Sequence, residues 1–103
     1  MKRNKSVLLP KVLTNLSMLG ENIRFVRLRR RLPMRVICEK AHISKPTLIS
    51  IEKGMPEVSI GLYALVLNIL GNFDDELSEI AKDDRIGRTI QDLNIKIPRR
   101  VRR

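Results

Sequence analysis

Aromatic residues, cysteine and histidine are all scarce in this chain of 103 residues. Aromatics make up only 3% of it and tryptophan is absent. This argues against a protein that stacks unpaired bases on aromatic side chains, as proteins that bind single strands or RNA loops do. The single cysteine, Cys38, excludes a disulfide within the chain. With one histidine, no glycine-rich phosphate loop and no pair of nucleophile and base, we expect neither an enzyme nor a cofactor.

No apolar run near the N-terminus is long enough for a signal sequence or a membrane span. The run Val7 to Leu9 is broken by Pro10 and Lys11, whereas a spanning helix needs about 20 apolar residues. We therefore expect a cytoplasmic protein that shares its compartment with the nucleoid and does not bind a membrane.

The charges are strongly segregated along the chain, whose formal net charge is +10. Residues 1–18 carry +4, residues 19–54 carry +6, residues 55–84 carry −6 and residues 85–103 carry +6. A basic surface attracts phosphates, and an acidic segment does not. The pattern predicts one basic side of the molecule that faces a polyanion and one acidic side that does not.

The first two thirds of the chain show helical periodicity. Apolar residues recur at spacings of three and four from Leu9 to Val26, which predicts a helix that ends near Arg31. Two short helices should follow, one after Pro33 and one after the N-cap candidate Ser44. The residues expected to face the core in these two helices are Ile37, Cys38, Ala41, Leu48 and Ile51. Gly54 is expected to take positive φ at the end of the second.

The next helix is expected from the N-cap candidate Ser59 to the C-terminal Gly71. Its predicted core positions are Ile60, Tyr63, Ala64, Leu67 and Leu70. Its other sides are also apolar, at Leu62, Leu65, Val66 and Ile69. A domain of this size buries only a modest core, so we expect a homodimer with part of this helix in the interface.

An acidic helix is expected over residues 74–82, with Leu77, Ile80 and Ala81 facing the core. The division of the chain is thus a disordered basic N-terminus at 1–8, an all-α domain at 9–82 and an extension at 83–103 for dimer or partner contacts. The extension has a weak helical stripe at Ile86, Ile90 and Leu93. It then has a possible small strand at Ile95 and Ile97, and a basic tail.

The outward face of the helix after Ser44 has the side chains that contact base edges in the major groove of duplex DNA. Hydroxyls donate or accept, ammonium groups reach guanine, and methyl groups touch thymine. The predicted base-contacting residues are Lys45, Pro46, Thr47, Ile49 and Ser50. The predicted phosphate-contacting residues are Arg24, Arg31, Arg35, Ser44 and Lys53.

The segment I-S-K-P-T-L-I-S-I-E-K-G resembles the Cro/C1-type (Xre) helix-turn-helix family of repressors, and the similarity extends over residues 19–70. The resemblance implies a five-helix, lambda-repressor-like domain that binds operator DNA and represses transcription. It also implies that Arg27 and Glu52 form a structural ion pair. His42 departs from the family pattern, which usually has glycine at this left-handed turn position, but histidine tolerates that conformation.

A narrower resemblance is to the HipB-like antitoxins that accompany HipA-like serine/threonine kinase toxins. It rests on L-G-E-N-I-R-x-x-R-L-R-R, on S-I-G-L-Y-A-L-V-L-N-I-L-G, and on D-R-I-G-R-T-I-Q-D-L with the ending I-P-R-R-V-R-R. The resemblance implies a type II toxin–antitoxin system that represses its own operon. Its protein partner would be a HipA-like kinase toxin, in some systems with a third small protein.

Three alternatives remain open at this point. The chain could be a stand-alone phage-type repressor without a toxin partner, or a structural adaptor whose basic face binds an acidic protein. Short amphipathic helices also occur in bundles that bind no nucleic acid. Besides these alternatives for the function, the alternative to an ion pair of Arg27 and Glu52 is two independent surface charges.

Overall fold

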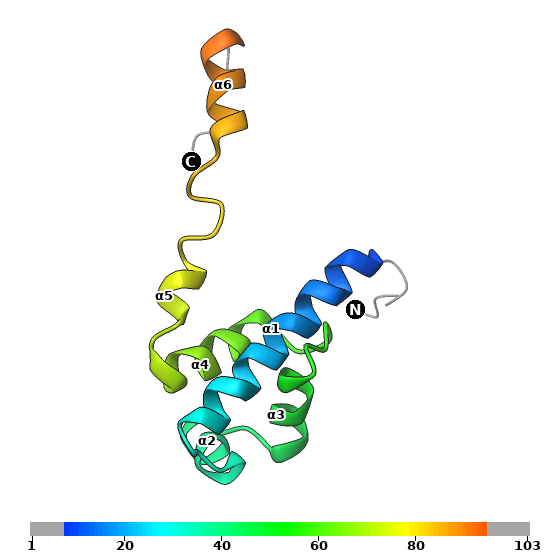
Figure 1. Ribbon diagram of the computed structural model, residues 1–103, viewed down its shortest axis with the longest axis vertical. Coiled ribbons are helices and arrows are strands. Elements are labelled where there is room, and N and C mark those ends of the chain that lie inside the picture. Colours follow the sequence, from blue (N-terminus) through cyan, green and yellow to red (C-terminus); the bar gives the residue numbers. More distant parts are fainter. Residues whose placement is uncertain (1–7, 95–103) are drawn as a thin grey trace.

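The computed structural model describes residues 8–94, which form six α-helices and no strand (Figure 1). Of these residues 71% are helical, so the prediction of an all-α fold is confirmed. The predicted strand at Ile95 and Ile97, the basic tail and residues 1–7 lie outside the described part. The helices are α1 (Pro10–Arg29), α2 (Met34–Ala41), α3 (Lys45–Glu52), α4 (Ile60–Gly71), α5 (Asp74–Leu77) and α6 (Arg85–Asn94).

The core lies among α1, α2, α3 and α4, and each of these helices contributes to it. α1 packs against α3 and α4, and α2 packs against the same two helices. The buried side chains of its main cluster are Ile23, Ile37, Leu48, Ile51, Tyr63, Val66 and Leu70, and Ala41 is also buried. Leu48, Ile51 and Ile37 are inward as predicted. Seven large side chains in one cluster are a small core, as expected for a chain of this length.

The turns that reverse the chain depend on left-handed residues at the ends of helices. His42 follows α2 with φ 57° and ψ 44°, and Gly54 follows α3 with φ 71°. Both conformations agree with the expectations from the sequence. Since glycine adopts positive φ without a penalty and histidine does not, the turn at His42 stores a small strain that the packing of α2 and α3 offsets.

The predicted core face of α4 was partly wrong. Val66, assigned to another side of the helix, is 1% exposed, whereas Ile60, assigned to the core, is 72% exposed. The inward face runs through Tyr63, Val66 and Leu70. Because nearly every residue of α4 is apolar, hydrophobic periodicity does not distinguish one face from another. The predicted N-cap is observed, since the Ser59 side chain accepts a hydrogen bond from the Leu62 N–H at 3.3 Å.

The acidic helix is much shorter than predicted. α5 ends at Leu77, the following residues form turns, and Ala81 has φ 70°. Ile80, expected to face the core, is 69% exposed. The Ser78 hydroxyl donates to the Asp75 carbonyl at 2.7 Å, a local bond that competes with helix continuation. The prediction failed because carboxylates and helical spacing favour a helix only where a surface is available for its apolar side chains.

α6 stands apart from the other helices at the end of an extended connector (Figure 1). Asp84 caps its first turn, since the Gly87 N–H donates to Asp84 Oδ1 at 2.9 Å. Its apolar stripe consists of Ile86, Ile90 and Leu93, which are 75%, 56% and 78% exposed. The weak stripe predicted in the extension is therefore helical, and no part of the described chain covers it.

Candidate nucleic-acid interface

α3 is fixed to the core by two apolar side chains and begins with a side-chain cap. Leu48 and Ile51 are fully buried. The Ser44 Oγ accepts a hydrogen bond from the Thr47 N–H at 3.3 Å and lies 2.9 Å from the Thr47 hydroxyl. Pro46 occupies the first turn, where its missing N–H has no helical partner. These features set where α3 begins and which side of it faces outward.

The predicted base-contacting residues form the outward side of α3, but to different degrees. Lys45 and Pro46 are exposed, while Thr47, Ile49 and Ser50 are half-buried. The side chains with the freest access are therefore at the N-terminal end of the helix. A helix that enters a groove with its N-terminus uses this end for its first contacts.

An ion pair joins the C-terminal end of α3 to α1. Arg27 and Glu52 are each 7% exposed. Arg27 Nε donates to Glu52 Oε2 at 2.6 Å, and its Nη2 donates to Oε1 at 3.1 Å. Arg27 Nη1 donates to the Leu32 carbonyl at 3.0 Å. The guanidinium thus connects α1, the loop before α2 and the end of α3, and such a bidentate pair is geometrically specific.

Two glycines bring α1 and the end of α3 into backbone contact. A Cβ on Gly20 would lie 2.7 Å from the Ile51 carbonyl oxygen, and a Cβ on Gly54 would overlap the Leu16 carbonyl. No other residue leaves room for this approach. Sequence reasoning missed this role for Gly20. The available signal was a glycine on the apolar stripe of a long helix, a position where it costs about 1 kcal/mol relative to alanine.

All five predicted phosphate-contacting residues are exposed. They are Arg24 on α1, Arg31 after α1, Arg35 on α2, and Ser44 and Lys53 at the two ends of α3. Arg35 Nη1 lies 3.7 Å from Glu39 Oε2, and both side chains are mostly exposed. An exposed pair of this kind contributes at most about 1 kcal/mol, so it does not prevent Arg35 from binding another anion.

Arg30 has a different environment from Arg24 and Arg31, although it lies in the same arginine-rich stretch. Its Nη1 donates to the Leu70 carbonyl at the end of α4, and its guanidinium carbon lies 5.7 Å from the centre of the Phe73 ring. Arg30 follows Ile23 by seven residues, so it projects from the core-facing side of α1. It therefore stabilises the C-terminal end of α4 and is not available to a ligand of α3.

Tyr63 holds the loop between α3 and α4. Its hydroxyl donates to the Met55 carbonyl at 2.7 Å. Burial, with a smaller contribution from the Glu57 carboxylate, raises the pKa of the Tyr63 hydroxyl above its ordinary value of 10.0. At neutral pH the group remains a hydrogen-bond donor, and the loop that follows α3 remains attached to α4.

Residues 8–94 contain neither a cluster of metal-ligating side chains nor a helix suited to a membrane. No group of three or more metal-ligating side chains occurs there, and the free Cys38 is half-buried beside the core. Among the same residues, no helix combines the length and the apolar character that crossing a membrane requires. Comparisons with models of protein families, with curated proteins and with solved structures found no match for this chain.

Proposed function

We propose that this protein is a sequence-specific transcriptional repressor that binds duplex operator DNA as a homodimer through a Cro/C1-type helix-turn-helix, formed by α2 and α3. The observation that carries the proposal is that the rest of the domain holds α3 in one orientation. Its outward face is polar and basic at the N-terminal end, and its inward face is held by the core, by the Arg27–Glu52 pair and by the contact of Gly20 with Gly54. A helix that selects a base sequence must be held in a fixed orientation.

The proposed roles follow from the chemistry and position of each side chain. Lys45 reaches guanine acceptors, Thr47 and Ser50 exchange hydrogen bonds with base edges, and Ile49 and Pro46 supply apolar contact with thymine methyl groups. The exposed residues around them bind phosphates and set the register of the helix on the duplex. They are Arg24, Arg31, Arg35, Ser44 and Lys53.

The regional charges support a polyanionic ligand on this side of the molecule. Residues 19–54, which include all of α2 and α3 and the C-terminal half of α1, carry +6, and residues 55–84 carry −6. In a dimer, two copies of α3 would contact half-sites about 34 Å apart, one helical turn of the duplex. The operator should therefore have two-fold symmetry.

Binding measurements on a selected operator and on random duplex DNA test the assignment. Lys45→Ala should weaken operator binding by about 1 to 3 kcal/mol and relax the preference at one base position, whereas Arg35→Ala should weaken both ligands alike. Lys82→Ala is the matched control, because it removes the same charge from the acidic part of the chain. Equal losses for Lys45→Ala and Lys82→Ala would refute the role of α3.

Salt dependence separates this proposal from the adaptor that binds an acidic protein. Each phosphate contact that a lysine or arginine makes releases counterions, so the logarithm of the affinity falls linearly with the logarithm of the salt concentration. Arg35→Ala should reduce that slope by about one for duplex DNA. A slope that Arg35→Ala leaves unchanged would contradict the phosphate assignment.

Within this function, we propose the narrower role of a HipB-like antitoxin that represses its own operon together with a HipA-like kinase toxin. The support is the sequence resemblance in α1, α4 and α6, and the acidic surface from Asp74 to Asp84, which lies outside the proposed DNA contact. The alternative is a stand-alone phage-type repressor. Co-purification of the full chain with the product of the adjacent gene distinguishes the two, since only the antitoxin retains a partner.

A further inference from the structure

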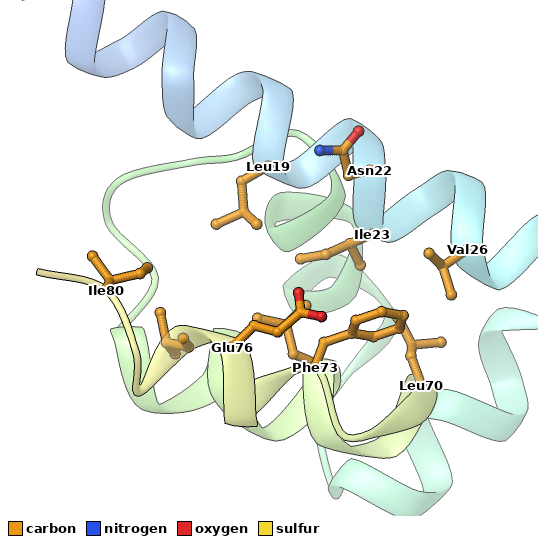
Figure 2. A pocket seen from close by; sticks show the side chains of 10 residues that line it. Leu19, Asn22, Ile23, Val26, Leu70, Phe73, Glu76 and Ile80 are labelled. Carbon is orange, nitrogen blue, oxygen red and sulfur yellow. The ribbon is translucent and has the colours of Figure 1, made fainter. Parts of the chain in front are cut away.

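An apolar groove lies on the side of the core formed by α1, α4 and α5 (Figure 2). Its volume is about 440 Å³. Leu19, Ile23 and Val26 of α1 line one wall, and Glu76 on the opposite side extends its carboxylate toward α1. The remaining apolar lining residues are Leu67, Leu70, Phe73, Leu77 and Ile80. An uncovered apolar surface of this kind next to the core indicates a contact site.

The same chain has an unpaired apolar helix face. Ile86, Ile90 and Leu93 of α6 follow one another at spacings of four and three, so they lie on one side of the helix, and all three are exposed. A helix of ten residues has too few hydrogen bonds to be more than marginally stable in water without packing. α6 therefore requires a surface against which to bury this stripe.

The charges around the two surfaces are complementary. Glu76 lies at the groove, within the acidic segment that begins at Asp74. Arg85 directly precedes Ile86 and lies a little over a quarter of a turn from it around α6, so it flanks the apolar stripe. A docked α6 would thus place an arginine near a carboxylate while its apolar side chains enter the groove.

The connector carries α6 away from α1, α4 and α5 (Figure 1), the helices whose side chains form the groove. The Lys82 N–H donates to the Glu79 carbonyl at 3.1 Å, and these two residues also form an ion pair. Arg88 Nη1 pairs with Asp83 Oδ1 at 3.3 Å. Ile80 at the groove and the cap residue Asp84 are separated by only three residues, so α6 begins with little freedom to turn back.

We propose that the groove receives α6 of a second copy of this chain, and that the reciprocal exchange of the two α6 helices forms the dimer. A two-fold exchange uses the same contact twice and covers both grooves and both stripes. The proposed partner is thus an identical chain, and the contact is formed by Ile86, Ile90 and Leu93 of one copy with the groove of the other. This surface is separate from α3, so the inference does not rest on DNA binding.

Sedimentation of the full chain in the absence of DNA tests the exchange. Ile90→Asp on α6 and Ile80→Asp at the groove each place a carboxylate in the contact and should raise the dimer dissociation constant at least about tenfold. Both residues are exposed in the single chain, so neither substitution disturbs the core. The matched control Gln91→Asp adds the same charge on the other side of α6 and should leave the dimer unchanged.

Mixing the two variants distinguishes exchange between chains from docking within one chain. In a mixed dimer, the intact α6 of the Ile80→Asp chain meets the intact groove of the Ile90→Asp chain, and the other contact carries both carboxylates. Because one carboxylate already breaks a contact, the second adds little to that loss. The mixed dimer thus keeps one full contact where each variant alone keeps none, and the mixture should dimerise more strongly than either variant alone. Docking within one chain predicts no such recovery, because each chain has one damaged surface. That outcome, or a wild-type dissociation constant shared by both variants, would overturn the proposal. Since no DNA is present, failure here leaves the proposed role of α3 standing.

Charge reversal gives an independent check on the orientation of the docked helix. Glu76→Arg and Arg85→Glu should each weaken the dimer several-fold, and the double variant should regain most of the loss. Additive losses in the double variant would show that these two side chains do not meet and would refute the proposed orientation of α6.

Discussion

Replacing Glu52 with alanine removes one half of a buried ion pair and leaves the other half inside the protein. In the intact protein Arg27 makes two bonds to the Glu52 carboxylate, at 2.6 and 3.1 Å, and one to the Leu32 carbonyl. The variant retains only the last of these. Because an unpaired buried charge is far more costly than the pair is stabilising, the expected loss is about 3 to 5 kcal/mol.

That loss would be a large share of the whole stability of a small domain, which is typically about 5 to 15 kcal/mol. Urea-induced unfolding followed by circular dichroism measures it, with the free energy of unfolding obtained from the midpoint and the slope. The control is Glu39→Ala, which breaks the exposed pair with Arg35 and should cost at most about 1 kcal/mol. A loss below about 1 kcal/mol for Glu52→Ala would show that the pair does not hold α3 to α1.

The joint replacement of Arg27 by methionine and Glu52 by leucine removes the ion pair but keeps the buried volume filled. It therefore distinguishes the contribution of the charges from that of packing. Apolar residues of similar volume leave no unpaired charge, and such replacements are often neutral or stabilising in other proteins. The double variant should therefore be more stable than Glu52→Ala alone. A double variant less stable than Glu52→Ala would mean that the hydrogen bonds of Arg27 themselves stabilise the fold, and that the unpaired charge is not the main cost of Glu52→Ala.

Three further predictions concern the backbone, the alkaline range and the extension. Gly54→Ala should destabilise the fold strongly, because φ is 71° and a Cβ would overlap the Leu16 carbonyl. Gly61→Ala in α4 would bring a Cβ only into ordinary van der Waals contact with Ser59 Oγ, at 3.8 Å, and should stabilise by about 0.5 to 1 kcal/mol in thermal unfolding. The raised pKa of Tyr63 means that its hydroxyl keeps its proton to a higher pH in the folded state than in the unfolded chain. The resulting stability is present below about pH 10 and is lost as the pH rises through the raised pKa. Tyr63→Phe should therefore cost about 1 kcal/mol at pH 7 and show a shallower alkaline loss of stability, and equal alkaline slopes would contradict this. Truncation after Asp84 removes no core residue, so the melting temperature of the monomer should persist while dimers disappear, and persistent dimers would count against the exchange of α6.

The sequence was sufficient for the part of the fold whose faces differ in polarity. α2 and α3 each have one clearly apolar side, and their buried residues, the N-cap at Ser44 and the left-handed His42 agree with expectation. α4 did not meet this condition, since its sides are almost equally apolar, and Ile60 was placed in the core when it is exposed. Hydrophobic periodicity identifies the buried face of a helix only where its faces differ in polarity.

Only some residues of the candidate site could be predicted from the sequence. Residues that act through their side-chain chemistry, such as Lys45 and Arg35, could be proposed from type and spacing alone. Gly20 could not, because its contribution is the absence of a side chain at a contact with Ile51 and Gly54, which are far away in the sequence. Arg30 was similar to its neighbours in type, and only the position of Leu70 and Phe73 separates its role from theirs.

The backbone contact between Gly20 and Gly54 also has a thermodynamic consequence for whatever α3 binds. Side-chain contacts can rearrange by changing rotamers, but two peptide backbones in direct contact have no such freedom. The orientation of α3 is thus already ordered before a ligand arrives, and little conformational entropy remains to be lost on binding. Amide hydrogen exchange in α3 should be slow in the free protein and should change little in the complex.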